Sequence, residues 1–182
     1  MRIYTRTGDQ GLSSLFDGER VKKYHLRLKT YGELDYLNVI IGWSRLKNTI
    51  PKIDSVLLKI TNDIFIISSI LATKDLSKLP ENLKTIDENS TLDFEVLIDE
   101  LTSEMPALTN FILPGGSELS LYFHEARVIA RTAERYVVEL ADEEDIDKNL
   151  IIYINRLSDL FFTLARYANF ALKVDEDVWV SC

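Results

Sequence analysis

The stretch ELSLYFHEARVIARTAERYVVELA, residues 118–141, contains the pattern that decides the fold. Its apolar side chains recur at intervals of three and four, at Leu119, Tyr122, Ala126, Ile129, Ala133, Tyr136 and Leu140. This spacing places them on one face of a helix, which must then pack into a core. The stretch therefore predicts an amphipathic helix over 118–141.

The rest of the chain has the same helical spacing in four further segments, 28–48, 52–74, 92–105 and 146–174. Pro51 stands where a helix can begin, and Ser117 can cap the helix that follows the break Leu113-Pro114-Gly115-Gly116. Residues 141–147 read as a tight acidic turn, and strand alternation is confined to residues 2–5. We predict an all-α, up-and-down bundle of four to five helices, formed by residues 25–182 of a single domain, 1–182, with an irregular N-terminal arm over 1–24.

Composition limits the class of protein. The 182 residues are 46% hydrophobic and carry a net charge of -8, which fits one globular domain and disfavours nucleic acid or an anionic membrane as a partner. No window of 18 apolar residues and no apolar leader is present, and the single Cys182 excludes an intrachain disulfide. We therefore expect a soluble, cytoplasmic protein.

Three arginines lie on one face of the helix over 118–141. Arg127, Arg131 and Arg135 are spaced at i, i+4 and i+8. Like charges four residues apart destabilise a helix by roughly 0.2–0.5 kcal/mol per pair, so the row indicates a negative partner. The negative partner of the row is either Glu134 or a bound nucleotide.

Residues 5–14, TRTGDQGLSS, form a second polar group. Gly8 and Gly11 let backbone amides turn inward, and the hydroxyls together with Arg6 and Lys23 supply donors suited to phosphate. The alternative is that these residues belong to a flexible N-terminus without a binding role. The chain lacks the sequence of a P-loop, so a triphosphate must be held in another way.

Polar residues also interrupt the predicted helices. For Arg156 and Asp159 an intrahelical ion pair is the expected role, whereas Asp35 and Asn155 lie beside apolar stripes and favour a ligand or an intersubunit contact. His124 is expected to be a packed or capping residue. Phe111 is either an anchor of its loop in the core or the wall of a pocket for a large flat cofactor.

A metal centre is not expected. The residues three before His25 and His124 are Lys22 and Leu121, so the paired Glu-x-x-His motifs of di-iron bundles are missing. Two histidines and one cysteine also argue against a zinc site.

The order of the motifs resembles the PduO-type ATP:cob(I)alamin adenosyltransferases, a family of cobalamin adenosyltransferases. The matching blocks are IYTRTGDQG at 3–11, GERVKK at 18–23, YGELD at 31–35, FILPGG at 111–116, residues 126–135, INRLSD at 154–159 and ARYA at 165–168. They extend through nearly the whole chain in the order that the family uses.

The resemblance implies a left-handed, ferritin-like bundle that assembles as a homotrimer, with active sites between neighbouring subunits. ATP with Mg²⁺ would be the co-substrate and reduced cobalamin the substrate, and the product would be adenosylcobalamin plus triphosphate. A corrinoid reductase and an adenosylcobalamin-dependent enzyme are the implied protein partners. The positions carried over to nucleotide binding are Thr5, Arg6, Thr7, Gly8, Ser13, Ser14, Lys23, Arg131, Thr132, Ala133, Glu134, Arg135 and Asn155.

Four residues carry over to the chemistry: Arg131, Phe111, Asp35 and Arg127. The resemblance implies that Arg131 contacts phosphate, that Asp35 and Arg127 pair across the subunit interface, and that Phe111 crowds the lower face of the corrin. Arg6, Tyr36 and Thr132 depart from the residues common in the family. The alternatives are a non-catalytic carrier or regulatory bundle that binds ATP or a corrinoid, and a helical interaction protein whose arginines pair with its own acids.

Overall fold

The computed structural model describes residues 3–180, so the predicted role of Cys182 lies outside the described residues. Within that range the chain forms five α-helices: α1 (Leu26–Lys47), α2 (Pro51–Leu71), α3 (Glu88–Glu104), α4 (Glu118–Glu143) and α5 (Lys148–Leu172). A 3₁₀ turn, η1 (Leu76–Lys78), follows α2. None of these helices is long and apolar enough to cross a membrane.

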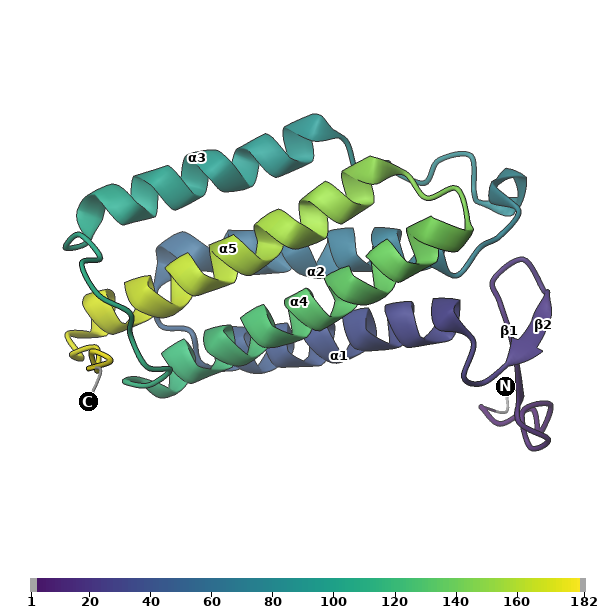
Figure 1. Cartoon of the computed structure of the whole chain (residues 1–182), viewed down its shortest axis with the longest axis horizontal. Coiled ribbons are helices and arrows are strands. Elements are labelled where there is room, and N and C mark those ends of the chain that lie inside the picture. The colour runs from purple at the N-terminus through teal and green to yellow at the C-terminus, as the bar shows by residue number, and fades with distance from the viewer. Residues whose placement is uncertain (1–2, 181–182) are drawn as a thin grey trace.

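The helices run alternately up and down, as Figure 1 shows. α4 packs against both α1 and α5, α2 packs against α1, and α3 lies on the outside against α5. The predicted all-α up-and-down bundle is confirmed.

The apolar stripes meet in one core. Leu37 of α1, Ile60 of α2, Phe123 of α4 and Phe161 of α5 are fully buried. Burying each such side chain stabilises a fold by roughly 1.5–3 kcal/mol. The helices can therefore present polar groups on their outer faces without losing the fold.

Caps set several helix boundaries. Pro51 occupies the first turn of α2, and the Ser117 hydroxyl accepts a hydrogen bond from the Ser120 amide at the start of α4, as predicted. α3 begins four residues earlier than predicted because Asp87 and Ser90 form a capping box, which the apolar spacing does not reveal. The predicted turn at 141–147 is shorter than expected, since α4 continues to Glu143 and Asp147 caps α5.

The N-terminal arm contains a small hairpin, so the expectation that strand pattern is confined to residues 2–5 was wrong. β1 (Leu12–Ser14) pairs antiparallel with β2 (Arg20–Lys22), in a register that places Ser13 opposite Val21. Three-residue strands are too short for a sequence pattern to reveal. Gly18, at φ 90°, allows the turn between them, and the Phe16 amide donates to the Ala72 carbonyl at 2.8 Å, which fixes the hairpin to the end of α2.

Candidate functional site

The arm forms an open hollow of about 660 Å³ lined by Arg6, Thr7, Asp9, Gln10, Ser14 and Arg20. Arg20 holds its wall together, because Nη1 donates to Ser14 Oγ at 3.0 Å and Nη2 donates to the Thr7 carbonyl at 2.5 Å. No sequence pattern assigned a role to Arg20, although the hairpin register places it directly opposite Ser14. Hydroxyls and guanidinium groups around one hollow suit an anionic ligand.

Lys23 and Gly8 lie together in the same arm. A Cβ at Gly8 would lie 3.3 Å from the Lys23 ammonium and 3.3 Å from the Leu12 carbonyl oxygen, so this position favours a residue without a side chain. The Lys23 amide donates to the Gly11 carbonyl at 3.0 Å. The hydroxyls of Thr5 and Thr7 are 2.9 Å apart. The predicted arm residues are therefore gathered in one region.

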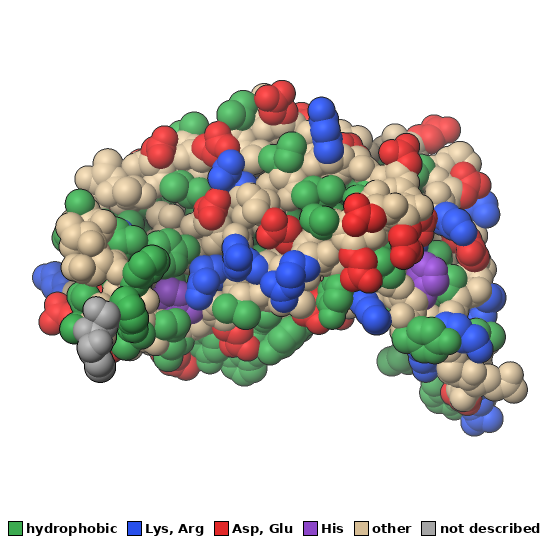
Figure 2. Space-filling view, in the orientation of Figure 1, with side chains coloured by type: hydrophobic (Ala, Val, Ile, Leu, Met, Phe, Trp, Pro, Cys, Tyr) green, Lys and Arg blue, Asp and Glu red, His purple; other side chains and the backbone are tan. Residues whose placement is uncertain are grey.

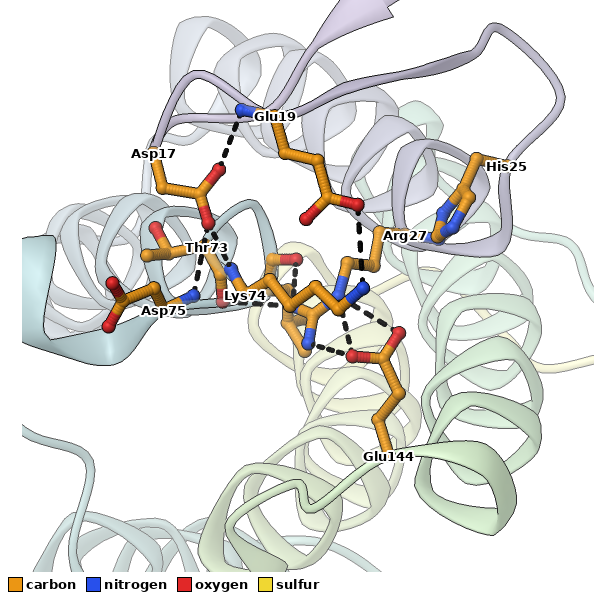
Figure 3. A network of polar contacts seen from close by, with 9 residues as sticks. Asp17, Glu19, His25, Arg27, Thr73, Lys74, Asp75 and Glu144 are labelled. Carbon is orange, nitrogen blue, oxygen red and sulfur yellow. Dashed lines mark hydrogen bonds and ion pairs between the residues drawn. The ribbon is translucent and has the colours of Figure 1, made fainter.

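The hairpin is fixed to the segment that follows α2, shown in Figure 3. The Asp17 carboxylate accepts hydrogen bonds from the amides of Lys74 and Asp75, each at 3.0 Å, and from the Glu19 amide at 3.1 Å. These bonds lower the pKa of Asp17, with the Asp75 amide as the largest cause. The Glu19 carboxylate also forms an ion pair with Lys74.

Arg27 lies on the other side of that segment, buried at the start of α1 (Figure 3). Its Nη1 donates to the carbonyls of Leu71 and Thr73 at 2.8 and 3.0 Å, and its Nη2 donates to Glu144 at 2.6 Å. The hydrogen bond from Arg27 lowers the pKa of Glu144. The arm is thereby linked through the segment 71–75 to the ends of α1, α2 and α4.

The basic row predicted on α4 lies on the outer face of the bundle. Figure 2 shows basic side chains in a line across this face, over the course of α4 in Figure 1. Among residues 3–180, Arg127, Arg131 and Arg135 form no ion pair. Burial, followed by the charge of Arg131, lowers the pKa of Arg127. The row therefore has uncompensated positive charge within the described chain.

Neighbours of the row take other partners. Glu134, considered as a partner for the arginines, instead accepts a hydrogen bond from Asn155 Nδ2 at 2.7 Å. Arg135 donates to the Thr132 hydroxyl at 3.0 Å. Ala133 is fully buried, so its side chain faces the core.

The predicted ion pair within α5 is confirmed, since Arg156 Nη1 lies 2.8 Å from Asp159. Asp35 on α1 is exposed and forms no ion pair with Arg127 or another cation among residues 3–180. Tyr36, the neighbour of Asp35, donates its hydroxyl to Glu125 at 2.9 Å.

His124 is a packed residue, as expected. It is 5% exposed, and its ring meets the edge of Phe162 at a centroid distance of 6.2 Å. Burial, with a smaller contribution from Arg127, lowers the pKa of His124 to about 4. The histidine is therefore neutral at physiological pH.

Phe111 is 79% exposed, so the alternative that it anchors its loop in the core was wrong. Together with Leu108, Thr109, Asn110 and Trp179 it lines an open hollow of about 450 Å³. Its ring meets Trp179 edge-on at 6.3 Å, and the Trp179 amide donates to the Phe111 carbonyl at 2.8 Å. The loop thus presents an aromatic surface at the end of the bundle, backed by the C-terminal tail.

The arm and the Phe111 loop lie at opposite ends of the bundle, with the length of α4 between them (Figure 1). One chain therefore does not bring the arm hollow and the aromatic hollow together. No group of three histidine, cysteine or acidic side chains within residues 3–180 is arranged to hold a metal ion.

Comparison with known proteins gives these residues a context. A family model described as cobalamin adenosyltransferase matches residues 3–168. The chain is 39% identical to the corrinoid adenosyltransferase of Bacillus subtilis, over 93% of this chain and 87% of that protein. It is 41% identical to the corrinoid adenosyltransferase PduO of Citrobacter freundii over 91% of its own length, but it spans only about half, 49%, of that relative.

Solved structures have the same fold. A phenylalanine-to-alanine variant of the PduO-type ATP:corrinoid adenosyltransferase from Lactobacillus reuteri, complexed with cobalamin and ATP, superposes with a TM-score of 0.93 and 36% identity. The superposition covers 99% of this chain and 100% of that one. An arginine-to-lysine variant from the same organism, complexed with ATP, gives a TM-score of 0.90 at 36% identity over 98% and 100% of the two chains.

Proposed function

Because the chain belongs to the cobalamin adenosyltransferase family, we propose that it transfers the 5′-deoxyadenosyl group of ATP to the cobalt of cob(I)alamin. The products are adenosylcobalamin and triphosphate. The observation that carries the proposal is the row Arg127, Arg131 and Arg135, whose positive charge has no acidic partner within the described chain. A polyphosphate supplies the missing negative charge.

The reaction sets specific demands on the protein. The cobalt of cob(I)alamin attacks C5′ of ATP, so a cobalt–carbon bond forms while the C5′–O bond breaks and its electron pair leaves on the triphosphate. The protein must orient C5′ in line with the cobalt and stabilise the charge on the leaving group. No general base is required, because no proton is removed from the nucleophile.

The arm and α4 meet these demands with different groups. Gly8, Lys23 and the hydroxyls of the arm hollow bind the phosphates, and Arg131 stabilises the charge that develops on them. Asn155 and Glu134, which already share a hydrogen bond, present a donor and an acceptor to the nucleoside. A Mg²⁺ ion brought in with ATP would supply further positive charge at the triphosphate, which fits the preference of this ion for phosphate and water over a cage of protein ligands.

The active enzyme is a homotrimer in this proposal, with each site between neighbouring subunits. The position of the arm and the Phe111 loop at opposite ends of one bundle supports an assembly in which two chains complete one site. Asp35 and Arg127, which form no ion pair among residues 3–180, then pair across the interface. Burying this charge pair fixes the orientation of the two subunits.

The aromatic hollow receives the corrin. Phe111 and Trp179 exclude water and a lower ligand from the cobalt, because their exposed rings offer no donor atom that the cobalt binds. Reduction of cob(II)alamin becomes easier once that ligand is removed. The enzyme would act in the cytoplasm, receiving electrons through a corrinoid reductase and supplying an adenosylcobalamin-dependent enzyme.

The test uses purified protein, chemically reduced cob(I)alamin and MgATP under anaerobic conditions, with light-sensitive adenosylcobalamin and triphosphate as readouts. Replacing Arg131 with alanine is expected to lower kcat/KM by about a hundredfold or more, since it removes a charge-stabilising donor, while the trimer mass stays unchanged. Arg45→Ala is the matched control, because Arg45 pairs with Asp54 away from the arginine row.

Equal activity of Arg131→Ala and wild type would remove Arg131 from the site. Wild-type protein that binds ATP yet forms no product would instead identify a nucleotide-binding carrier or regulatory bundle.

A further inference from the structure

Asn169, near the end of α5, is 2% exposed and directs its side chain at the glycine loop that follows Phe111. Its Oδ1 accepts hydrogen bonds from the amide and hydroxyl of Ser117, at 2.8 and 2.9 Å. Its Nδ2 donates to the Gly115 carbonyl at 3.1 Å. A single amide thus binds three atoms of the segment that joins the loop to α4.

The loop approaches Asn169 as closely as its backbone allows. Gly116 has a φ of 89°, in the left-handed region that glycine favours. A Cβ at this position would lie 2.5 Å from both amide heteroatoms of Asn169. The contact therefore depends on the absence of a side chain at Gly116.

The main chain of Asn169 also directs the C-terminal tail. Its carbonyl accepts from the amides of Lys173 and Val174, where the left-handed Lys173 ends α5. The tail then returns along the loop, because the Leu113 amide donates to the Asp177 carbonyl at 2.8 Å and Ile112 bridges to Val178. Asn169 therefore holds one end of the loop directly and starts the segment that pairs with its middle.

We propose that Asn169 is a positioning residue for Phe111, which orients the aromatic side chain against the corrin by fixing the glycine loop. This inference rests on the proposed function. Two adjacent glycines separate Phe111 from α4 and give the loop wide backbone freedom. The side-chain amide removes that freedom without contacting the substrate itself.

The role predicts a selective defect. Transfer to preformed cob(I)alamin requires the nucleotide groups of the arm and α4, none of which Asn169 contacts within the chain's described residues. Turnover from cob(II)alamin with a reductant also requires Phe111 to keep a lower ligand off the cobalt. Loosening the loop therefore impairs the second reaction more than the first.

The experiment compares wild type with Asn169→Ala and Asn169→Asp. The aspartate keeps the oxygen that accepts from Ser117 and loses the donor to Gly115. Tyr153→Phe is the matched control on the same helix, because it removes a partly buried hydrogen bond to Asp63 that lies away from the loop. Thermal unfolding and trimer mass establish that each variant is folded.

Both reactions are measured for every protein, together with the electron paramagnetic resonance spectrum of cob(II)alamin in the presence of ATP. For Asn169→Ala we expect turnover from cob(II)alamin to fall by about tenfold or more, with a smaller four-coordinate signal. Transfer to cob(I)alamin and the KM for ATP stay within about threefold of wild type. For Asn169→Asp we expect turnover from cob(II)alamin between the values of wild type and Asn169→Ala. For Tyr153→Phe we expect the same turnover as for wild type.

Equal losses in both reactions would overturn the inference, since they would indicate a structural role only. An unchanged spectrum and unchanged turnover would overturn it as well. A wild-type protein without transfer to cob(I)alamin would refute the proposed function instead, so the two failures are distinguishable.

Discussion

Replacing His124 with glutamine is expected to weaken the dependence of stability on pH between pH 7 and pH 5. His124 is buried on α4, and burial together with the nearby charge of Arg127 lowers its pKa from 6.5 to about 4. In the unfolded chain the imidazole regains an ordinary pKa. As the pH falls below about 6.5, the unfolded state therefore binds a proton that the folded state does not.

The size of the effect follows from the two pKa values. A tenfold rise in proton concentration costs about 1.4 kcal/mol of stability wherever only the unfolded state binds the proton. That condition holds from about pH 6.5 down to pH 5, so the wild-type chain loses about 2 kcal/mol of unfolding free energy from this residue between pH 7 and pH 5. Stability falls as the pH falls, and the loss levels off below about pH 4.

Urea unfolding followed by far-UV circular dichroism at pH 7, 6 and 5 measures the effect at a fixed protein concentration. Glutamine cannot titrate, so the variant keeps only the pH dependence of the other groups, which both proteins share. The difference between the two curves isolates His124, whatever the variant costs at pH 7. Parallel curves over this range would refute the assignment of a depressed pKa to a buried neutral imidazole.

Two further substitutions test the network at the arm. Arg27→Met leaves Glu144 and the carbonyls of Leu71 and Thr73 without their donor, and we expect about 3 kcal/mol of destabilisation in urea unfolding. Arg45→Met removes an ion pair whose arginine is only half-buried, and we expect it to cost under about 1 kcal/mol. Equal losses for the two variants would contradict the importance of burial. Asp17→Ala removes the acceptor for three backbone amides. We therefore expect faster proteolysis of the arm and a higher KM for ATP, with the main melting transition unchanged. An arm as resistant to proteolysis as that of wild type would show that other contacts hold the hairpin. The pKa of Asp17 is lowered in the folded state. The stabilisation of the arm by this carboxylate is therefore present above the ordinary pKa of aspartate and is lost as the pH falls through the lowered folded-state pKa.

The helices could be predicted because long amphipathic stripes leave a strong periodic signal. The stripe from Leu119 to Leu140 lies within α4, and Pro51 and Ser117 mark helix starts as expected. The hairpin over residues 12–22 could not be found in this way, since its strands are three residues long and are fixed by contacts with the end of α2. Local pattern carries no information about such distant partners.

Part of the candidate site could also be predicted from the sequence, and part could not. The row Arg127, Arg131 and Arg135 follows from helical spacing, and its place on an outer face follows from the apolar stripe opposite. The exposure of Phe111 did not follow from its apolar neighbours, because the returning C-terminal tail takes the contacts that a core would have supplied. The contact between Asn169 and the glycine loop could not be predicted either, since an asparagine late in an apolar helix is typical of an ordinary helix end.

The close approach of Gly116 to Asn169 also constrains how this family can diverge. A left-handed backbone alone would admit asparagine or aspartate at position 116, but a Cβ there would lie 2.5 Å from the Asn169 amide and would displace it from its hydrogen bonds to Gly115 and Ser117. A lineage that keeps these hydrogen bonds is therefore expected to keep glycine at 116, whereas one that acquires a small residue at 169 gains freedom there. Positions 116 and 169 are 53 residues apart in this sequence, and we expect them to change together among relatives.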